Sequence, residues 1–345
     1  MLVISFHVIQ KIKPTDTLTY TFKTVFAGTW GWVGVDLFFV ISGYLITRIL
    51  LHIRGEPHCL RSFYLRRICR IVPLYYASLV LFGWLVPQLP FDWAETLSIM
   101  PQDWLRFLFF TANSGTHIFT LPYYLHFWTL CLEMHFYLLW PLVVLWIRPS
   151  LLLRVSICLI MAIALLRLAL IMEGVNGRAV YINSVTHMDI PLYGALIAIL
   201  EYEHKSLASF CHAVRILTVI SFFGLIILAY FSQGLRFYNG MTEMFGFMLD
   251  GILFASILLL TLQPDHNRRL TRILENPFFS ICGKYSYGMY IFHYPLIRII
   301  SMITGDDTIT VMLLLPCAIG IALICGFLSW HLIEKQFLKI PYYKT

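Results

Sequence analysis

The sequence predicts an all-α membrane protein, a polytopic bundle of about ten transmembrane helices. The chain has 345 residues, of which 59% are hydrophobic and only 12% are charged, with a mean hydropathy of +0.77. Soluble domains carry ~25% charged residues, and half that amount cannot cover a water-facing surface of this size. Long apolar runs separated by short basic clusters complete the pattern. These three observations exclude a soluble enzyme and a disordered chain.

The net charge of +7 does not indicate a nucleic-acid partner. Binding to a phosphate backbone needs a basic face exposed to water, and here the basic residues lie between long apolar runs. We therefore expect membrane lipids, and not nucleic acid, around this chain.

Apolar runs of helical length define the predicted elements, since one crossing needs ~20 mostly apolar residues. They cover residues 31–51, 71–90, 125–147, 151–172, 213–232, 241–262, 279–303 and 309–330, with a shorter run at 188–202. Residues 1–10 are apolar but too few to cross, and we interpret them as the second half of a truncated first helix. Together these segments are predicted to form one integral-membrane domain over residues 1–345.

The distribution of lysine and arginine predicts the orientation, because cytoplasmic loops are enriched in both. Alternate connections carry the basic residues, namely Arg54, Arg61, Arg66, Arg67 and Arg70, then Arg148 and Arg154, Lys205 and Arg215, Arg268, Arg269 and Arg272, and finally Lys335, Lys339 and Lys344. The exception is the stretch 11–23, with Lys11, Lys13 and Lys23. We expect a multi-pass protein of the inner (cytoplasmic) membrane with both termini in the cytoplasm.

No motif indicates a metal site, a disulfide framework or a nucleotide-driven pump. The 8 cysteines are scattered without a C-x-x-C pair, so no zinc site is predicted. The sequence has no Walker loop and no G-x-G-x-x-G loop. The informative residues are therefore the polar ones inside apolar segments, which are costly to bury and are usually functional or paired.

Three of these polar residues are candidates for chemistry. His7 lies in the first apolar segment, where a packing role fits as well as a catalytic one. Asp36 lies among Val, Leu and Phe, so it must find a partner or take up a proton, and a helix–helix hydrogen bond would also explain it. The nearby Ser42 and Gly43 could admit a neighbouring helix or a thin acyl group. Glu133 is the costliest group to bury without purpose and is the strongest candidate for an active role.

A dense basic run covers residues 61–73. Arg66 and Arg70 are four residues apart, which places them on one helical face, and Arg67 lies beside them. Guanidinium groups bind phosphates well, so this spacing suits a polyanion such as coenzyme A. Cytoplasmic loops are rich in basic residues even where no ligand binds, so the alternative that this run binds nothing stays open.

The other buried polar residues are expected to have structural roles. His293 lies next to a proline, where its ring can hydrogen-bond at a helix break. Asp189 and Asp250 are expected to line a cavity or to pair with Arg167. Glu334 is expected to form the end of the last helix, with its charge reaching toward water.

Five segments resemble the acyltransferase-3 family of integral-membrane acyltransferases. They read GVDLFFVISGYLI, FYLRRICRIVPLYY, FWTLCLEMHFYLLWP, YSYGMYIFHYPL and HLIEKQFL. The stretch THMDIPLYGALIA also resembles the family, in which arginine is more usual at the place of His187. The resemblance implies a ten-helix bundle that moves an acyl group, commonly acetyl from acetyl-CoA, to a hydroxyl of an envelope polysaccharide or lipid-linked sugar.

The resemblance also implies roles for individual residues. His7 matches the essential histidine of the family's first helix, and Glu133 matches the first acid of its W-[ST]-L-x-x-E motif. The basic motif proposed to contact the acyl-CoA donor is matched by Arg66, Arg67 and Arg70. The family usually has an arginine well before its histidine, so the start of this chain is expected to be truncated or misplaced. No fused hydrolase-like domain is expected at the other end.

Transfer of acetyl from a thioester to a hydroxyl needs a base, and histidine is the usual choice near neutral pH. Asp36 or Glu133 could orient His7 and stabilise its imidazolium, and the sequence does not choose between them. An acyl-histidine intermediate is the other route.

Two other functions stay open. A proton-coupled transporter or exporter of a glycan or metabolite would use Glu133, Asp36 and Asp189 as a proton relay. An inactive partner in envelope assembly would need neither His7 nor Glu133. The aromatic-rich loop 87–124 is predicted to be either a wall of the acceptor site or an interfacial loop.

Overall fold

The computed structural model describes residues 2–9, 31–115, 117–121, 123–204, 207–232, 235–236, 239–263, 268–304 and 308–339. Every regular element among these residues is a helix and none of them lies in a strand, which confirms the all-α class. The basic stretch 11–23 and the residues Lys205 and Lys344 lie outside the described residues. The chain forms two compact units, and each is described by itself below.

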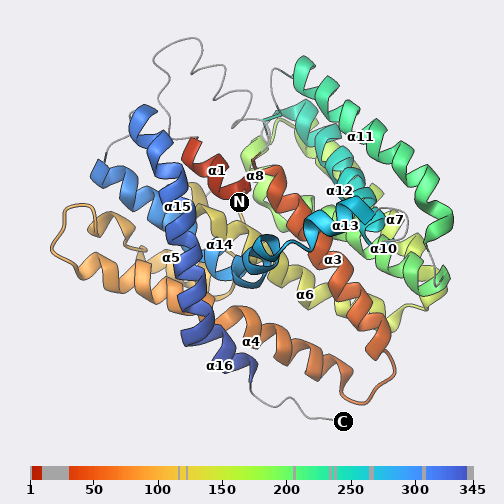
Figure 1. Cartoon of the computed structure of the whole chain (residues 1–345), viewed down its shortest axis with the longest axis horizontal. Coiled ribbons are helices and arrows are strands. Elements are labelled where there is room, and N and C mark those ends of the chain that lie inside the picture. Colours follow the sequence, from red (N-terminus) through yellow and green to blue (C-terminus); the bar gives the residue numbers. More distant parts are fainter. Residues whose placement is uncertain are drawn as a thin grey trace. The chain divides into compact units, whose positions relative to one another are not determined.

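The first unit combines Met1–Ala27, Leu60–Cys131 and Pro277–Thr345. Its helices are α1 (Leu2–Ile9), α4 (Cys59–Val80), α5 (Pro101–Leu108), α14 (Pro277–Thr304), α15 (Thr308–Ser329) and α16 (Lys335–Leu338). α4 continues through a π-helical turn, and α1 packs against α14 and α15 (Figure 1). Segments from the two ends of the chain therefore share one unit.

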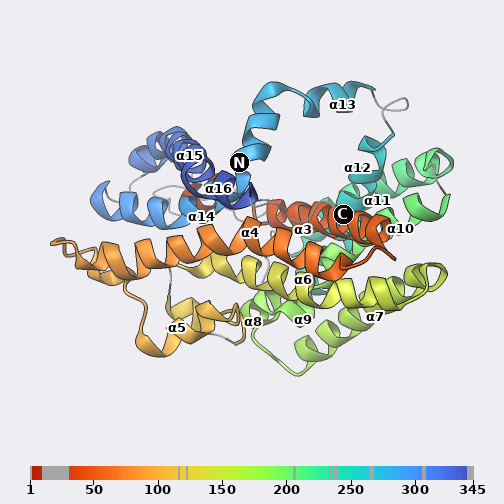
Figure 2. The ribbon, with the colours of Figure 1, turned by 90° about the horizontal axis from the view of Figure 1, so that it is seen from below.

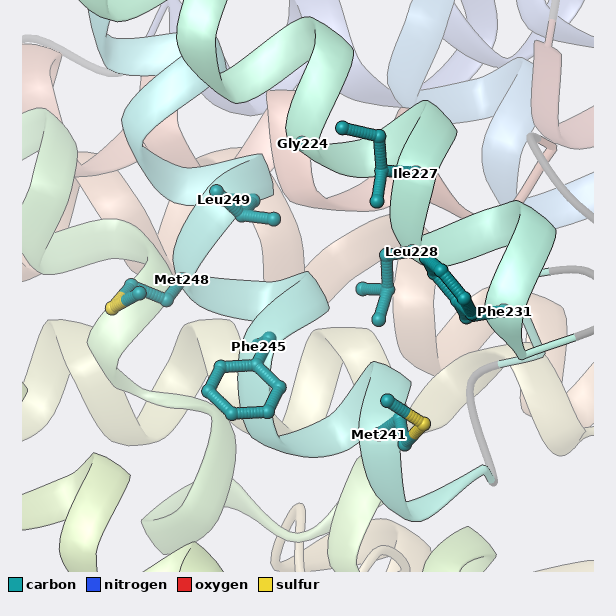
Figure 3. A pocket seen from close by; sticks show the side chains of 8 residues that line it. All are labelled: Gly224, Ile227, Leu228, Phe231, Met241, Phe245, Met248 and Leu249. Atoms are coloured by element: carbon teal, nitrogen blue, oxygen red, sulfur yellow. The ribbon is translucent and has the colours of Figure 1, made fainter.

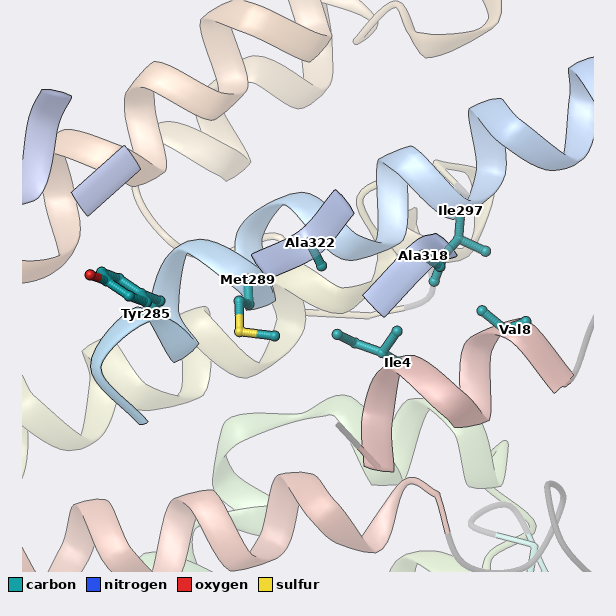
Figure 4. Packing of buried hydrophobic residues seen from close by; sticks show 7 residues of the cluster. All are labelled: Ile4, Val8, Tyr285, Met289, Ile297, Ala318 and Ala322. Carbon is teal, nitrogen blue, oxygen red and sulfur yellow. The ribbon is translucent and has the colours of Figure 1, made fainter. Parts of the chain in front are cut away.

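An apolar cluster holds α1 in place. Ile4 and Val8 are four residues apart, so they lie on one face of the helix. They pack with residues of α14 and α15 (Figure 4), namely Tyr285, Met289, Ile297, Ala318 and Ala322. The short alanine side chains on α15 leave room for the larger residues of α1. This packing fixes the rotation of α1 about its axis and hence the direction of its polar residue, His7.

The second unit combines Gly28–Cys59 and Leu132–Asn276. Its helices are α3 (Val33–Ile53), most of α6 (Trp128–Trp146), α7 (Pro149–Met172), α8 (Gly177–Ile182), α9 (Ser184–His187), α10 (Asp189–His204), α11 (Cys211–Phe231), α12 (Phe247–Thr261) and α13 (Arg268–Leu274). The short helices α8 and α9 lie next to each other and against α7 (Figure 2). α3 packs along α10 and also contacts α12.

Two glycines bring α3 and α10 into backbone contact. A Cβ on Gly43 of α3 would lie 1.9 Å from the carbonyl oxygen of Pro191, and a Cβ on Gly194 of α10 would lie 1.8 Å from that of Val40. Only a residue without a side chain permits this approach. The sequence allowed either a helix or an acyl group beside Gly43, and the structure places helix α10 there.

Several helices have the length and composition of membrane spans. Among the described residues there are seven such segments, namely Val33–Ile53, Cys59–Gln88, Leu125–Trp146, Pro149–Met172, Ala208–Phe231, Thr242–Thr261 and Pro316–Leu338. The most apolar 18-residue windows of α7 and α11 bury only 17% and 22% of their residues inside the structure, against 56% for α3. Such exposed apolar helices need lipid around them, so this is a multi-pass membrane protein.

The remaining predicted crossings form helices that meet only part of this description. α14 has 28 residues, but it carries several polar side chains, among them Lys284, His293 and Arg298. α10 has 16 residues and α1 has 8, both fewer than the ~20 that a straight crossing needs. The total of ten crossings and the single domain over residues 1–345 stay predictions.

An apolar groove of about 260 Å³ lies between α11 and α12 (Figure 3). Its lining is formed by Gly224, Ile227, Leu228, Phe231, Met241, Phe245, Met248 and Leu249. None of the predicted site residues lines it, and several of its side chains are exposed. The groove is therefore part of the lipid-facing surface and not a site for polar chemistry.

Replacing Gly194 with alanine is expected to lower stability, because the new Cβ forces α10 away from the Val40 carbonyl oxygen. Overpacking of this kind costs roughly 1–3 kcal/mol. The loss of stability is measured by heating the protein in detergent and monitoring the folded fraction by size-exclusion chromatography. Gly320→Ala in α15 is the matched control, because a Cβ there meets no described atom within 4 Å. Equal unfolding midpoints for the two variants would contradict the backbone contact.

Candidate active site

Three histidines gather around α1 in the first unit. The ring centroid of His7 lies 5.4 Å from that of His293 and 4.4 Å from that of Tyr294. His126 lies 5.4 Å from His293 and 5.3 Å from Tyr294. Within its own unit, His7 therefore has a histidine and a tyrosine of α14 as described ring neighbours.

Backbone carbonyl groups anchor two of the three rings. The Nε2 atom of His126 donates to the carbonyl oxygen of Ile291 at 3.1 Å. The Nδ1 atom of His293 donates to the carbonyl oxygen of Tyr290 at 2.6 Å, which confirms the predicted hydrogen bond. The predicted helix break is wrong, because α14 continues through Pro295 to Thr304. The hydroxyl of Tyr290 in turn donates to the carbonyl oxygen of His126 at 2.9 Å. These bonds join α14 to the turn that precedes α6.

The cluster does not have the geometry of a metal centre. Within the described part of the chain, no group of three or more His, Cys, Asp or Glu side chains could hold a metal ion. The ring nitrogens that would serve as ligands on His126 and His293 are partly engaged with carbonyl oxygens. Neutral imidazole rings held in this way suit proton transfer.

In the second unit, Asp36 finds the partner that its burial requires. Its Oδ1 atom lies 3.0 Å from Nε2 of His187, and both side chains are fully buried. This contact joins α3 to the end of α9. Sequence reasoning noted His187 only as a departure from the more usual arginine. The available signal was that a second basic residue type, histidine, stands where arginine is more usual.

A buried ion pair lies in the same unit. The guanidinium of Arg167 binds both carboxylate oxygens of Asp189, at 3.2 Å and 2.7 Å, and also donates to the carbonyl oxygen of Thr186 at 2.7 Å. It lies 4.9 Å above the ring of Phe247. The predicted pairing of Asp189 with Arg167 is therefore confirmed. Asp250 is also fully buried, and neither of its carboxyl oxygens has a hydrogen-bond partner among the described residues.

Glu133 joins α6 to α3. Its Oε1 atom accepts hydrogen bonds from the hydroxyls of Tyr137 and Ser42, the latter at 3.3 Å. The same two hydroxyls lie 3.2 Å from each other. Glu133 and Asp36 both belong to the second unit and His7 belongs to the first, so a pairing of His7 with either carboxylate stays a prediction.

The basic run lies on a helix, as the four-residue spacing of Arg66 and Arg70 had predicted, although the sequence placed the run in a connection before the apolar segment at 71–90. α4 begins at Cys59, so Arg66, Arg67 and Arg70 lie on its early turns. Arg67 lies 5.5 Å above the ring of Phe63. The helix starts before the apolar run at 71–90 because the basic residues are interleaved with apolar ones such as Phe63.

A second cation lies beside this run and was missed in the sequence. Arg70 lies 5.8 Å from the ring centroid of Trp330, and the Nζ atom of Lys284 lies 5.5 Å from the same ring. Neither cation forms an ion pair with a described carboxylate. Lys284 directly precedes the YSYGMYIFHYPL segment, and this position beside a family motif was the available signal. Two cations that share one indole ring form a concentrated positive surface.

Glu334 differs from its expected role at the end of the last helix. Its side chain is 1% exposed, and its Oε1 atom accepts a hydrogen bond from the Ser329 hydroxyl at 3.1 Å. Gly288 of α14 lies against both groups, and its lack of a side chain leaves room for them. The π-helical turn Trp330–Glu334 carries the carboxylate into the unit and not toward water.

Comparison with known proteins gives a consistent picture. The family model of the acyltransferase domain Acyl_transf_3 matches residues 1–331. A protein of Staphylococcus aureus (strain COL) named as a candidate O-acetyltransferase is 27% identical over 332 residues, which cover 90% of this chain and 53% of the relative. A candidate peptidoglycan O-acetyltransferase of Bacillus subtilis, YrhL, is 29% identical over 88% of this chain and 50% of its own length.

A third relative is the peptidoglycan O-acetyltransferase OatA of Listeria monocytogenes. It is 28% identical over 78% of this chain and 45% of its own length. The chain thus spans about half the length of the curated relatives it matches. No solved structure gives a significant match.

Replacing Asp189 with leucine is expected to destabilise the protein, because the buried Arg167 guanidinium loses its carboxylate. Removing one partner of a buried pair costs roughly 3–5 kcal/mol. The double variant Arg167→Met with Asp189→Leu removes both charges and is expected to recover part of that loss. Thermal unfolding in detergent compares the two. If the single variant is as stable as the wild type, the ion pair is not intact in the membrane protein.

Proposed function

The chain belongs to the acyltransferase-3 family, and on that premise we propose that it is a membrane O-acetyltransferase. The proposed acyl donor is acetyl-CoA, and the proposed acceptor is a hydroxyl of an envelope glycan. The names of two relatives favour peptidoglycan as the acceptor class. The observation that carries the proposal is His7, whose ring lies beside His293 in the unit that also holds His126 and the basic face of α4.

The proposed chemistry uses His7 as the base. Its imidazole takes the proton from the acceptor hydroxyl as the hydroxyl oxygen attacks the thioester carbonyl carbon. The C–S bond then breaks, and the departing thiolate of coenzyme A takes the proton back from the imidazolium. In the alternative route a ring nitrogen of His7 attacks the thioester carbonyl carbon, and the C–S bond breaks to release the thiolate of coenzyme A. The acceptor hydroxyl oxygen then attacks the acetyl carbon, the bond to the ring nitrogen breaks, and the released imidazole takes up the hydroxyl proton. Both routes place the same histidine at the reacting carbonyl.

The proposed donor site is the basic face of α4, with Arg66, Arg67 and Arg70. Arg66 is exposed, and Arg70 shares the Trp330 ring with Lys284. Coenzyme A carries several phosphate charges, which guanidinium groups bind with paired hydrogen bonds. We also assign this face to the cytoplasm, where acetyl-CoA is found, which agrees with the predicted inner-membrane location and cytoplasmic termini.

The proposed acceptor surface lies in the aromatic segment between α4 and α6. Phe91 and Trp93 stack with ring centroids 5.4 Å apart and planes within 7° of parallel. Phe109 is strongly exposed on the same segment. Flat aromatic rings stack well on the apolar faces of sugars, so this segment suits a glycan strand.

Each of the three carboxylates that the transporter alternative would use has a described partner. Asp189 is held by both arms of Arg167, Asp36 contacts His187 through Oδ1, and Glu133 accepts from two hydroxyls. The Oδ2 atom of Asp36 has no described hydrogen-bond partner. The transporter alternative therefore stays open, and activity that needs a proton gradient but no acyl donor would distinguish it.

Alkali-labile acetate on envelope glycans tests the proposed function. Cells that lack the gene are expected to lose this acetate, and wild type is expected to restore it. His7→Ala is expected to restore less than a hundredth, because general-base catalysis contributes about 100-fold or more. Glu133→Gln is included because its role as a partner of His7 is still a prediction. His52→Gln, an exposed histidine on α3, is the control that should behave as wild type. Full acetate with His7→Ala would refute the proposal.

The donor site is tested separately with purified protein in lipid bilayers. Arg70→Gln is expected to raise the KM for acetyl-CoA about tenfold with little change in kcat, since one charge-assisted phosphate contact contributes ~1.5–3 kcal/mol. Lys284→Gln is expected to act in the same direction. Arg148→Gln, which removes an exposed arginine at the start of α7, is the matched control. A drop in kcat at constant KM would place Arg70 outside the donor site.

A further inference from the structure

One ring nitrogen of His293 has no hydrogen-bond partner among the described residues. Its Nδ1 atom donates to the Tyr290 carbonyl oxygen, and its Nε2 atom is buried without a hydrogen-bond partner among the described residues. The side chain is 1% exposed. A buried polar atom without a partner is costly, so an atom in this position calls for an explanation.

The carbonyl contact fixes which nitrogen of His293 carries the proton. A carbonyl oxygen can only accept, so Nδ1 must be the N–H and Nε2 must hold the lone pair. A second proton would create a buried charge, and within the described residues no acid forms an ion pair with this ring. The same argument applies to His126, where Nε2 donates to Ile291 and Nδ1 holds the lone pair. Both rings therefore offer acceptors and no free donor.

His7, in contrast, needs a hydrogen-bond acceptor for a buried ring nitrogen. Its Nδ1 atom is buried without a described hydrogen-bond partner, and the residue as a whole is half-buried. The ring centroids of His7 and His293 are 5.4 Å apart and their planes are tilted by 36°, which is within reach of an N–H···N hydrogen bond after a small rotation. His7 makes such a ring contact with His293 but none with His126.

We propose that His293 is a positioning residue that accepts a hydrogen bond from Nδ1–H of His7 through its own Nε2 atom. His7 is then held in the tautomer that keeps its lone pair on Nε2. This inference rests on the proposed function for its catalytic consequence. Whether His7 acts as a base or forms an acetyl intermediate, the reacting lone pair is the one on Nε2. The titratable groups that face His7 are His293 and Tyr294 of α14, with His126 beside them.

The architecture around the pair supports this role. The packing of Ile4 and Val8 fixes the rotation of α1, and the Tyr290 carbonyl oxygen fixes the ring of His293 on α14. Both histidines therefore keep their orientation without a contribution from a carboxylate. A neutral acceptor also avoids placing a charged pair in the membrane interior, where charge is costly.

Two substitutions of similar polarity separate a positioning role from a packing role. Glutamine places its amide oxygen near the position of Nε2, so His293→Gln keeps an acceptor for His7. Asparagine is shorter and reaches only the position of Nδ1, so His293→Asn removes that acceptor. Because the loss is in orientation and not in donor binding, the Asn variant is expected to lower kcat about tenfold or more with KM for acetyl-CoA nearly unchanged. The Gln variant is expected to stay within about threefold of wild type.

Solid-state ¹⁵N NMR of histidine-labelled protein in bilayers tests the tautomer directly. The His7 signals are identified by their loss in His7→Gln, and wild type and His293→Gln are expected to show a proton on Nδ1. His293→Asn is expected to shift His7 toward the Nε2–H form. A wild-type spectrum with the proton on Nε2 of His7 overturns the inference, whatever the variants do. Equal kcat values for correctly folded Gln and Asn variants overturn it as well.

The two experiments also separate this inference from the proposed function. If wild-type protein transfers no acetyl from acetyl-CoA, the proposed function fails while the NMR result still decides the hydrogen bond. If wild type is active and the spectrum shows the Nε2–H form, the positioning role fails and the proposed function stands.

Discussion

The close approach of α3 and α10 is the constraint on which the second unit depends. Gly43 and Gly194 let each helix reach the other's backbone, and any side chain there would collide with a carbonyl oxygen. At this spacing Asp36 on α3 meets His187, and Asp189 at the start of α10 meets Arg167. Lipid does not drive helices together as water does, so small residues and buried polar contacts supply the specificity.

Around α1 the first unit uses neutral polar groups. The buried rings of His126 and His293 donate to backbone carbonyl oxygens, whereas the buried carboxylate of Glu334 lies elsewhere in the unit, beside Ser329. The two imidazoles leave acceptors unused, and the proposed chemistry needs an imidazole with a free lone pair. A site built from neutral donors and acceptors can move a proton without holding a permanent charge in the membrane interior.

The sequence predicted the elements well and their partners poorly. Apolar runs located α3, α7, α11 and α15 within a few residues, because ~20 apolar residues in a row have few alternatives to a membrane helix. α4 began earlier than predicted, since its first turns carry the basic run. His187 and Lys284 were not predicted as site residues. Their partners, Asp36 and Trp330, lie more than forty residues away along the chain. Glu334 was expected at a water-facing end and is buried.

The sequence by itself determined that this chain is a helical membrane protein, and its motifs placed it in a family. Composition and run length suffice for that, because the membrane leaves few structures open to an apolar chain. Only the tertiary structure decided that Asp36 meets His187, that Asp189 meets Arg167 and that His7 lies beside His293. Those pairings depend on how closely helices approach and how each is rotated, which are properties of packing between distant segments and not of any one segment.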